Sequence, residues 1–136
     1  MRNGNVRIAM LINAFWYKGG LMASVRIMYW KEIPVQVQVK TDEHNVSVQL
    51  NERFQHAVDA IAMLDGDIGG DKYLEGWAYG EWFEIEGEPS TIARELSSKY
   101  NEKMPLDIVT RLRDLTHNGK RRPIPGSIDH WIDPSR

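Results

Sequence analysis

The chain has 136 residues and a mass of 15.7 kDa, and 42% of its residues are hydrophobic and 26% charged. This is the usual size of one compact domain, so two full domains are not expected. The lack of cysteine excludes disulfides, thiol nucleophiles and cysteine-held zinc or iron–sulfur sites, and it fits a cytoplasmic location. A formal net charge of -2 argues against a protein that binds nucleic acid over its whole surface.

The first 21 residues contain an apolar run at 8–17, preceded by Arg2 and Arg7. The run is too short to span a bilayer, which takes about 20 apolar residues, and no signal-peptide cleavage site follows it. A self-sufficient sequence begins at Met22. Two alternatives stay open: residues 1–21 are either an extension upstream of the true start or an additional N-terminal strand or helix.

Three segments alternate apolar and polar residues, which is typical of strands with one buried face: 24–30, 35–40 and 46–50. In the second segment Val35, Val37 and Val39 share one face. The connection at 41–45 is short, polar and rich in turn formers. It predicts an antiparallel hairpin between the second and third strands.

The period changes at Asn51, a good helix N-cap, and an apolar stripe follows at helical spacing: Phe54, Ala57, Val58, Ile61 and Ala62. Gly66 is a plausible left-handed stop for this helix. Asp71 is expected to cap a second short helix that runs through Tyr73, Leu74 and Trp77.

The remaining elements are a fourth strand at 82–86 and two helices opened by Pro89 and Pro105, the second ending near Asn118. We therefore predict an α+β fold, an antiparallel sheet of three to four strands with helices packed on one face. Residues 22–119 form a single domain in this prediction. Residues 120–136 hold three prolines and little periodicity, which predicts an extended arm.

Several of these segments together resemble a small bacterial family, the virulence factor domain: residues 28–34, 48–55, 57–59 and 62–63, with Asp71, Tyr73, Leu74 and Trp77. The resemblance runs from about residue 25 to residue 100. Family members tend to be encoded beside folate- and corrinoid-linked methyl-transfer enzymes, so the resemblance implies an accessory role. It carries across no catalytic residues. Gly76 departs from the family pattern, so we expect the helix around Tyr73 to be looser here.

Residues that carry chemistry form no complete motif. Asp65 and Asp67 look like the start of a calcium loop, but glycines stand at positions five and twelve, where oxygen ligands are needed. His56 and Asp59 have the spacing of a base and its orienting acid, although a surface pair is the commoner outcome. We therefore predict no catalytic residues, no metal and no cofactor.

Two groups of residues are candidates for binding. The first is an aromatic group, since Tyr and Trp are enriched at interaction hot spots: Tyr73, Trp77, Tyr79, Trp82 and Phe83. The second is the basic cluster Lys120, Arg121 and Arg122, which could contact phosphates, although such residues more often complement the end of a helix.

Three functions follow from this pattern. The first is a non-enzymatic binding or accessory protein of the bacterial cytoplasm, which uses the aromatic group and the sheet edge to hold an unknown protein partner. The second is an accessory subunit or small enzyme of folate- or corrinoid-linked methyl transfer, with acids of residues 77–88 in a pocket. The third is a weak contact with nucleic acid through residues 120–131, which the overall charge disfavours. No membrane span is expected.

Overall fold

The computed structural model describes residues 22–133. The apolar run at 8–17 and the alternatives for residues 1–21 lie outside the described residues. The strands are β1 (Met22–Trp30), β2 (Ile33–Lys40), β3 (Asn45–Gln49), β4 (Trp77–Tyr79) and β5 (Phe83–Glu86). The helices are α1 (Glu52–Asp65), α2 (Asp71–Glu75), α3 (Pro89–Lys103), α4 (Ile108–His117) and the 3₁₀ helix η3 (Asp129–Ile132).

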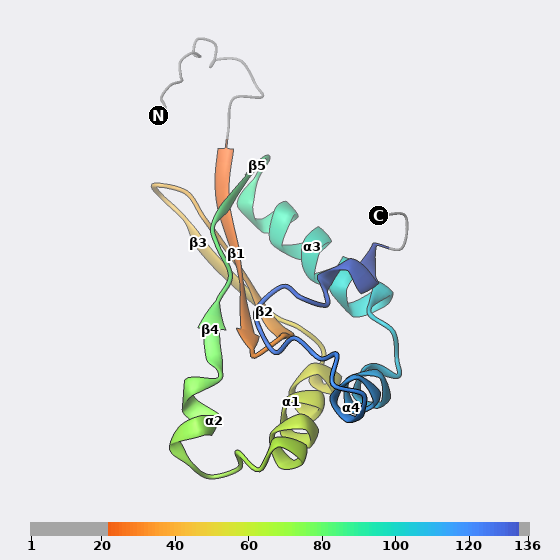
Figure 1. The fold of residues 1–136 in the computed structure, drawn as a ribbon. Coiled ribbons are helices and arrows are strands. Elements are labelled where there is room, and N and C mark those ends of the chain that lie inside the picture. The colour runs from red at the N-terminus through yellow and green to blue at the C-terminus, as the bar shows by residue number, and fades with distance from the viewer. Residues whose placement is uncertain (1–21, 134–136) are drawn as a thin grey trace.

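All described strand pairs are antiparallel, and the order across the sheet is β3, β2, β1, with β4 and β5 pairing successive parts of the outer edge of β1. Helix α3 packs on β2 and β3, while α1 packs on β2 and α4 (Figure 1). The predicted α+β fold and the hairpin of β2 and β3 are confirmed. On the other face of the sheet, which we call the open face, most alternate residues of β1, β2 and β3 stay at least partly accessible among residues 22–133.

The core lies between the sheet and the helices. Val35, Val37 and Val39 are at most 5% exposed, and the predicted stripe of α1 is buried, with Phe54 and Ile61 both 1% exposed. The left-handed conformation of Gly66 ends α1 as predicted, with a φ of 76°. The apolar face predicted from strand periodicity and the apolar stripe predicted from helix periodicity therefore both face the same core.

Two predicted helix boundaries are wrong. Helix α2 ends at Glu75, so Trp77 lies in β4 and pairs with Trp30 instead of continuing the helix. The cause is at Gly76, where an added Cβ would lie 2.5 Å from Nε1 of the Trp30 indole, so the chain passes the indole only without a side chain. Helix α4 begins at Ile108 and not at Pro105.

The tail after α4 is not a free extended arm over its described part. Its end forms η3, and Ile128 and Ile132 are buried in the core. The hydroxyls of Tyr29 and Tyr100 both donate to Oδ2 of Asp129, over 2.6 Å and 2.7 Å. Burial, together with the Asp129 charge, raises the pKa of both tyrosines well above the usual range, so they remain donors. Because the tail contains three prolines and little periodicity, its sequence pattern did not predict this packing.

Candidate functional site

The open face of the sheet is formed by the outward-pointing residues of each strand. Val25 and Ile27 in β1 are buried toward the helices, so Ser24 and Arg26 point to the opposite face. The register places Gln38 of β2 opposite Arg26. Because directly opposed residues share a face, the polar side chains of β1 and β2 lie next to one another on the open face.

Arg26 is the centre of this face. Its guanidinium carbon lies 3.5 Å from the ring centroid of Tyr79 and 4.3 Å from that of Trp82, and its Nε donates to Oε1 of Gln38 over 3.0 Å. The Nζ of Lys40 lies 4.5 Å from the Trp82 centroid. We call these five residues the Arg26 cluster.

The break between β4 and β5 positions the two rings. The backbone N–H of Gly80 donates to the Ile27 carbonyl over 2.8 Å, and an added Cβ at Gly80 would lie 3.0 Å from the Tyr29 ring. Tyr79 and Trp82 stand on either side of this glycine. The close backbone approach holds both against Arg26, but they stay 43% and 40% exposed.

The other predicted aromatic residues lie elsewhere. Tyr73 and Trp77 are half-buried in an aromatic group with Trp30. The ring centroids of Tyr73 and Trp30 are 5.7 Å apart in a tilted contact, and those of Tyr73 and Trp77 are 6.0 Å apart in an edge-on contact. Phe83 is opposite Val25, so it belongs to the helix side of the sheet, where it is 42% exposed at the edge. Of the aromatic group, the structure brings only Tyr79 and Trp82 together on the open face.

The basic cluster of the tail is divided by the fold. The Arg121 side chain is 8% exposed and binds Glu32, which is fully buried, through Nε over 2.7 Å and Nη2 over 3.0 Å. Its Nη1 donates to Oδ1 of Asp65 over 2.8 Å. Lys120 and Arg122 remain exposed. The predicted phosphate contact of Arg121 stays a prediction, and the structure adds that carboxylates already enclose this guanidinium.

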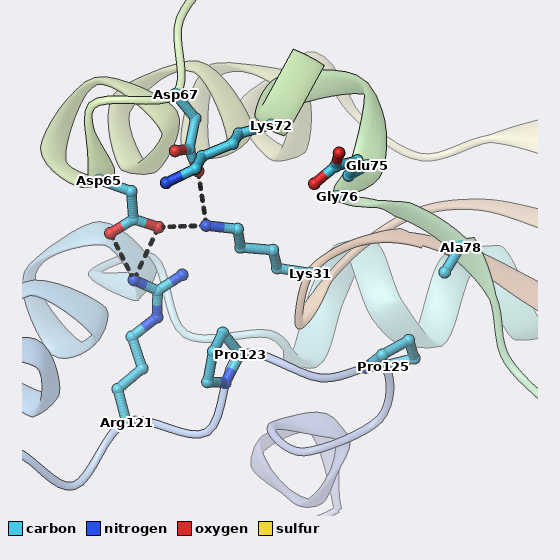
Figure 2. A pocket seen from close by; sticks show the side chains of 10 residues that line it. All are labelled: Lys31, Asp65, Asp67, Lys72, Glu75, Gly76, Ala78, Arg121, Pro123 and Pro125. Atoms are coloured by element: carbon cyan, nitrogen blue, oxygen red, sulfur yellow. Dashed lines mark hydrogen bonds and ion pairs between the residues drawn. The ribbon is translucent and has the colours of Figure 1, made fainter. Parts of the chain in front are cut away.

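A pocket of about 590 Å³ lies beside this arginine (Figure 2). On its wall the Lys31 Nζ donates to Oδ2 of Asp65 over 2.8 Å and to Oδ2 of Asp67 over 2.6 Å. The two acids of the calcium-like stretch therefore hold an ammonium group. The pocket is lined by Lys31, Asp65, Asp67, Lys72, Glu75, Gly76, Ala78, Arg121, Pro123 and Pro125.

The charges in this pocket are mutually stabilised. Burial raises the pKa of Asp65, but the hydrogen bonds and charges of Arg121 and Lys31 outweigh it and hold this pKa below its ordinary value. Burial lowers the pKa of Lys31 and of Arg121, and their carboxylate partners more than reverse this effect. All three groups stay ionised near neutrality. Proton transfer at that pH favours groups whose pKa lies near 7, so these residues suit a structural role better than a catalytic one.

The other candidate acids do not line this pocket. Oε1 of Glu88 accepts the Thr91 N–H over 2.9 Å at the start of α3, and this bond, with that from Ser90, lowers the Glu88 pKa. Glu84 accepts a hydrogen bond from the Ser24 hydroxyl. The structure does not make the proposed pair of His56 and Asp59, because Asp59 instead accepts from Gln55 over 3.1 Å.

Within residues 22–133, no group of three or more His, Cys, Asp or Glu side chains is placed to hold a metal ion. No helix of this described part has the length and apolarity needed to cross a membrane.

Sequence reasoning missed Arg26, Gln38 and Lys40. Each occupies an outward position of a predicted strand, which was the available signal, but nothing local indicated that β1 would meet residues 79–82. Among the described residues, no carboxylate forms an ion pair with Arg26. The cluster therefore presents two accessible rings and two cations, Arg26 and Lys40, for which residues 22–133 provide no ion pair.

A family model described as "Virulence factor" matches residues 28–112, from within β1 to within α4. The matched segment includes Gln38, Lys40, Tyr79 and Trp82 and leaves Arg26 outside. No curated protein and no solved structure matches the chain. Because the family model covers more than half of the residues, the chain belongs to the virulence factor family.

Proposed function

We propose that this protein is a non-enzymatic binding protein of the bacterial cytoplasm that holds a protein partner on the open face of its sheet. The observation that carries the proposal is the position of Arg26 between Tyr79 and Trp82, with both rings about two-fifths exposed. Arg, Tyr and Trp are the residues most enriched at the energetic centres of protein interfaces. Stacking already orders them, so a partner would lose less side-chain entropy on binding.

The charges around the cluster favour a protein over a nucleic acid. Lys40 and Arg26 are the cations of this region, and Glu84 and Glu86 share the face from β5. A nucleic-acid site needs a clear excess of positive charge along the phosphate backbone. A face that carries both positive and negative charges instead suits a protein partner whose surface also carries charges of both signs.

The ion pairs at the pocket support a non-enzymatic role. Lys31, Asp65 and Arg121 each bind an oppositely charged neighbour, and their pKa values move away from neutrality. These contacts join the turn between β1 and β2 to α1 and the tail. Their arrangement serves to fix the fold.

The test is site-specific photo-crosslinking in the source bacterium. A photoreactive amino acid replaces Ser47, which is exposed on β3 and lies opposite Gln38 without belonging to the cluster. The control position is Glu95, which is exposed on α3 at the other face. We expect one discrete protein adduct from position 47 and none of that size from position 95.

A second variant tests the cluster itself. Arg26→Ala in the chain labelled at position 47 should remove the adduct, while circular dichroism and the thermal midpoint show that the fold persists. An adduct that survives Arg26→Ala, or that forms equally well from position 95, would overturn the proposal.

A further inference from the structure

We infer that the part of the partner that binds the open face is an acidic segment, with two carboxylates that bind Arg26 and Lys40 beside the Trp82 ring. This inference rests on the proposed function and names the chemistry of the occupant of the same surface. It is carried by two cations that share one ring and form no ion pair within residues 22–133.

The Trp82 ring brings the two cations together. The Arg26 guanidinium carbon lies 4.3 Å from the ring centroid and the Lys40 Nζ lies 4.5 Å from it, so at most about 9 Å separates the two charges. Lys40 is at the end of β2, whereas Trp82 immediately precedes β5 on the other side of β1. The lysine side chain therefore reaches across β1. Two like charges at this distance repel each other, and negative groups beside them relieve the repulsion.

The Arg26 guanidinium is oriented so that part of it remains available. Its Nε donates to Oε1 of Gln38 over 3.0 Å, and Nε2 of Gln38 in turn donates to Oε1 of Gln36 over 2.8 Å. Nη1 and Nη2 of Arg26 donate to no acceptor within the described part of the chain. Paired N–H groups of a guanidinium match the two oxygens of a carboxylate, so one acid of a partner can accept from both.

The acids on the same face do not neutralise the two cations. Oε2 of Glu84 accepts the Ser24 hydroxyl over 2.7 Å, and Glu86 is opposite the first residue of β1. Neither acid forms an ion pair with a described cation. A partner that carries charges of both signs is therefore complementary when its acids lie at the Arg26 cluster and its basic groups lie toward β5.

The separation of the two cations suits acids that are two positions apart in an extended chain. Side chains i and i+2 of a strand point to the same side, about 7 Å apart along the backbone. Carboxylates at that spacing can each meet one of two cations that are at most about 9 Å apart. Directly adjacent acids in such a chain point to opposite sides, so only one of them would reach the cluster.

The experiment uses fluorescein-labelled hexaglutamate, whose fluorescence anisotropy is followed as the full chain is added. The chain has a net charge of -2, so its overall charge repels this probe and binding requires a local cationic site. We expect saturable binding that weakens as the salt concentration rises. Arg26→Gln and Lys40→Gln should each lower the affinity at least about threefold, because each leaves one carboxylate without its cation.

Matched controls remove the same residue types from the other side of the sheet. Arg94→Gln and Lys99→Gln change exposed residues of α3 and should leave the affinity unchanged. A labelled peptide of glycine and serine should not bind. Hexaglutamate that fails to bind, or that loses as much affinity in the α3 variants, would overturn the inference. Tighter binding of the glycine–serine peptide with one phosphoserine would also overturn it, because the preferred group would then be a phosphate.

The inference and the proposed function fail in different ways. If the adduct from position 47 depends on Arg26 but hexaglutamate does not bind, the proposed function stands and the acidic segment is wrong. If hexaglutamate binds through Arg26 and Lys40 but position 47 gives no protein adduct in the source bacterium, the proposed function is wrong.

Discussion

Arg26 and Arg121 are the same residue type in two different surroundings. The Arg121 side chain is 8% exposed and is enclosed by Glu32 and Asp65, so its charge is neutralised inside the protein. Arg26 is half-buried, lies against two aromatic rings, and forms no ion pair with a carboxylate of residues 22–133. The comparison teaches that the first arginine is enclosed by carboxylates of the fold, whereas the second carries its charge on an aromatic surface, where we propose that a partner binds.

The largest effect should come from removing the enclosed arginine. Arg121→Ala leaves Glu32 fully buried and Asp65 without their shared cation, and we expect the free energy of unfolding to fall by about 3–5 kcal/mol. Urea denaturation measures the change. Arg122→Ala, at the exposed neighbouring position, is the matched control and should stay within about 0.5 kcal/mol. Equal losses in the two variants would break the comparison.

A smaller loss should follow a change where α2 meets the sheet. Gly76→Ala forces a Cβ to within 2.5 Å of the Trp30 indole, so Trp30 or the backbone must move. Such overpacking costs about 1–3 kcal/mol. Gly70→Ala meets nothing within 4 Å and serves as the control in the same thermal melts. A Gly76→Ala protein as stable as the Gly70→Ala protein would show that the close approach does not matter.

Acid pH should destabilise the fold by protonating Asp65, which forms an ion pair with Arg121. Its pKa is lowered in the folded protein, so its contribution to stability is present above the unfolded pKa of about 3.9 and is lost as the pH falls through the folded value. In Asp65→Asn this part of the pH dependence, below about pH 4, should disappear. Unfolding curves at several pH values measure it, and parallel pH profiles for both proteins would contradict the assignment.

The smallest effect on stability is expected on the open face. Arg26→Ala removes cation–π contacts that are worth about 0.5–1 kcal/mol each at exposed sites, so the unfolding midpoint should move little. Binding should fall much more, because the variant removes the charge and loosens both rings. A large loss of stability with normal binding would show that Arg26 stabilises the fold, as Arg121 does, and does not serve binding.

Local patterns in the sequence were sufficient for most of the fold. The alternating valines of β2 and the stripe from Phe54 to Ala62 each depend on near neighbours, so periodicity finds them. The end of α2 was missed because Gly76 is required by Trp30, a residue distant in the sequence. Local propensity does not register such a contact.

The site was harder to predict for the same reason. Residue type alone made Tyr79 and Trp82 candidates for binding, but Arg26 reaches them only through the pairing of β1 with a distant edge strand. The enclosure of Arg121 was not predicted, because its main partner, Glu32, lies 89 positions away in the sequence. A run of basic residues looks the same in a sequence whether it faces solvent or carboxylates.

The most direct test of the central claim is the yield of the photo-crosslink from position 47 in cells, compared between the original chain and Arg26→Ala at equal protein levels. The account predicts a discrete adduct that disappears in the variant while its thermal midpoint is nearly unchanged. An equally strong adduct in both proteins would show that the open face does not bind through Arg26.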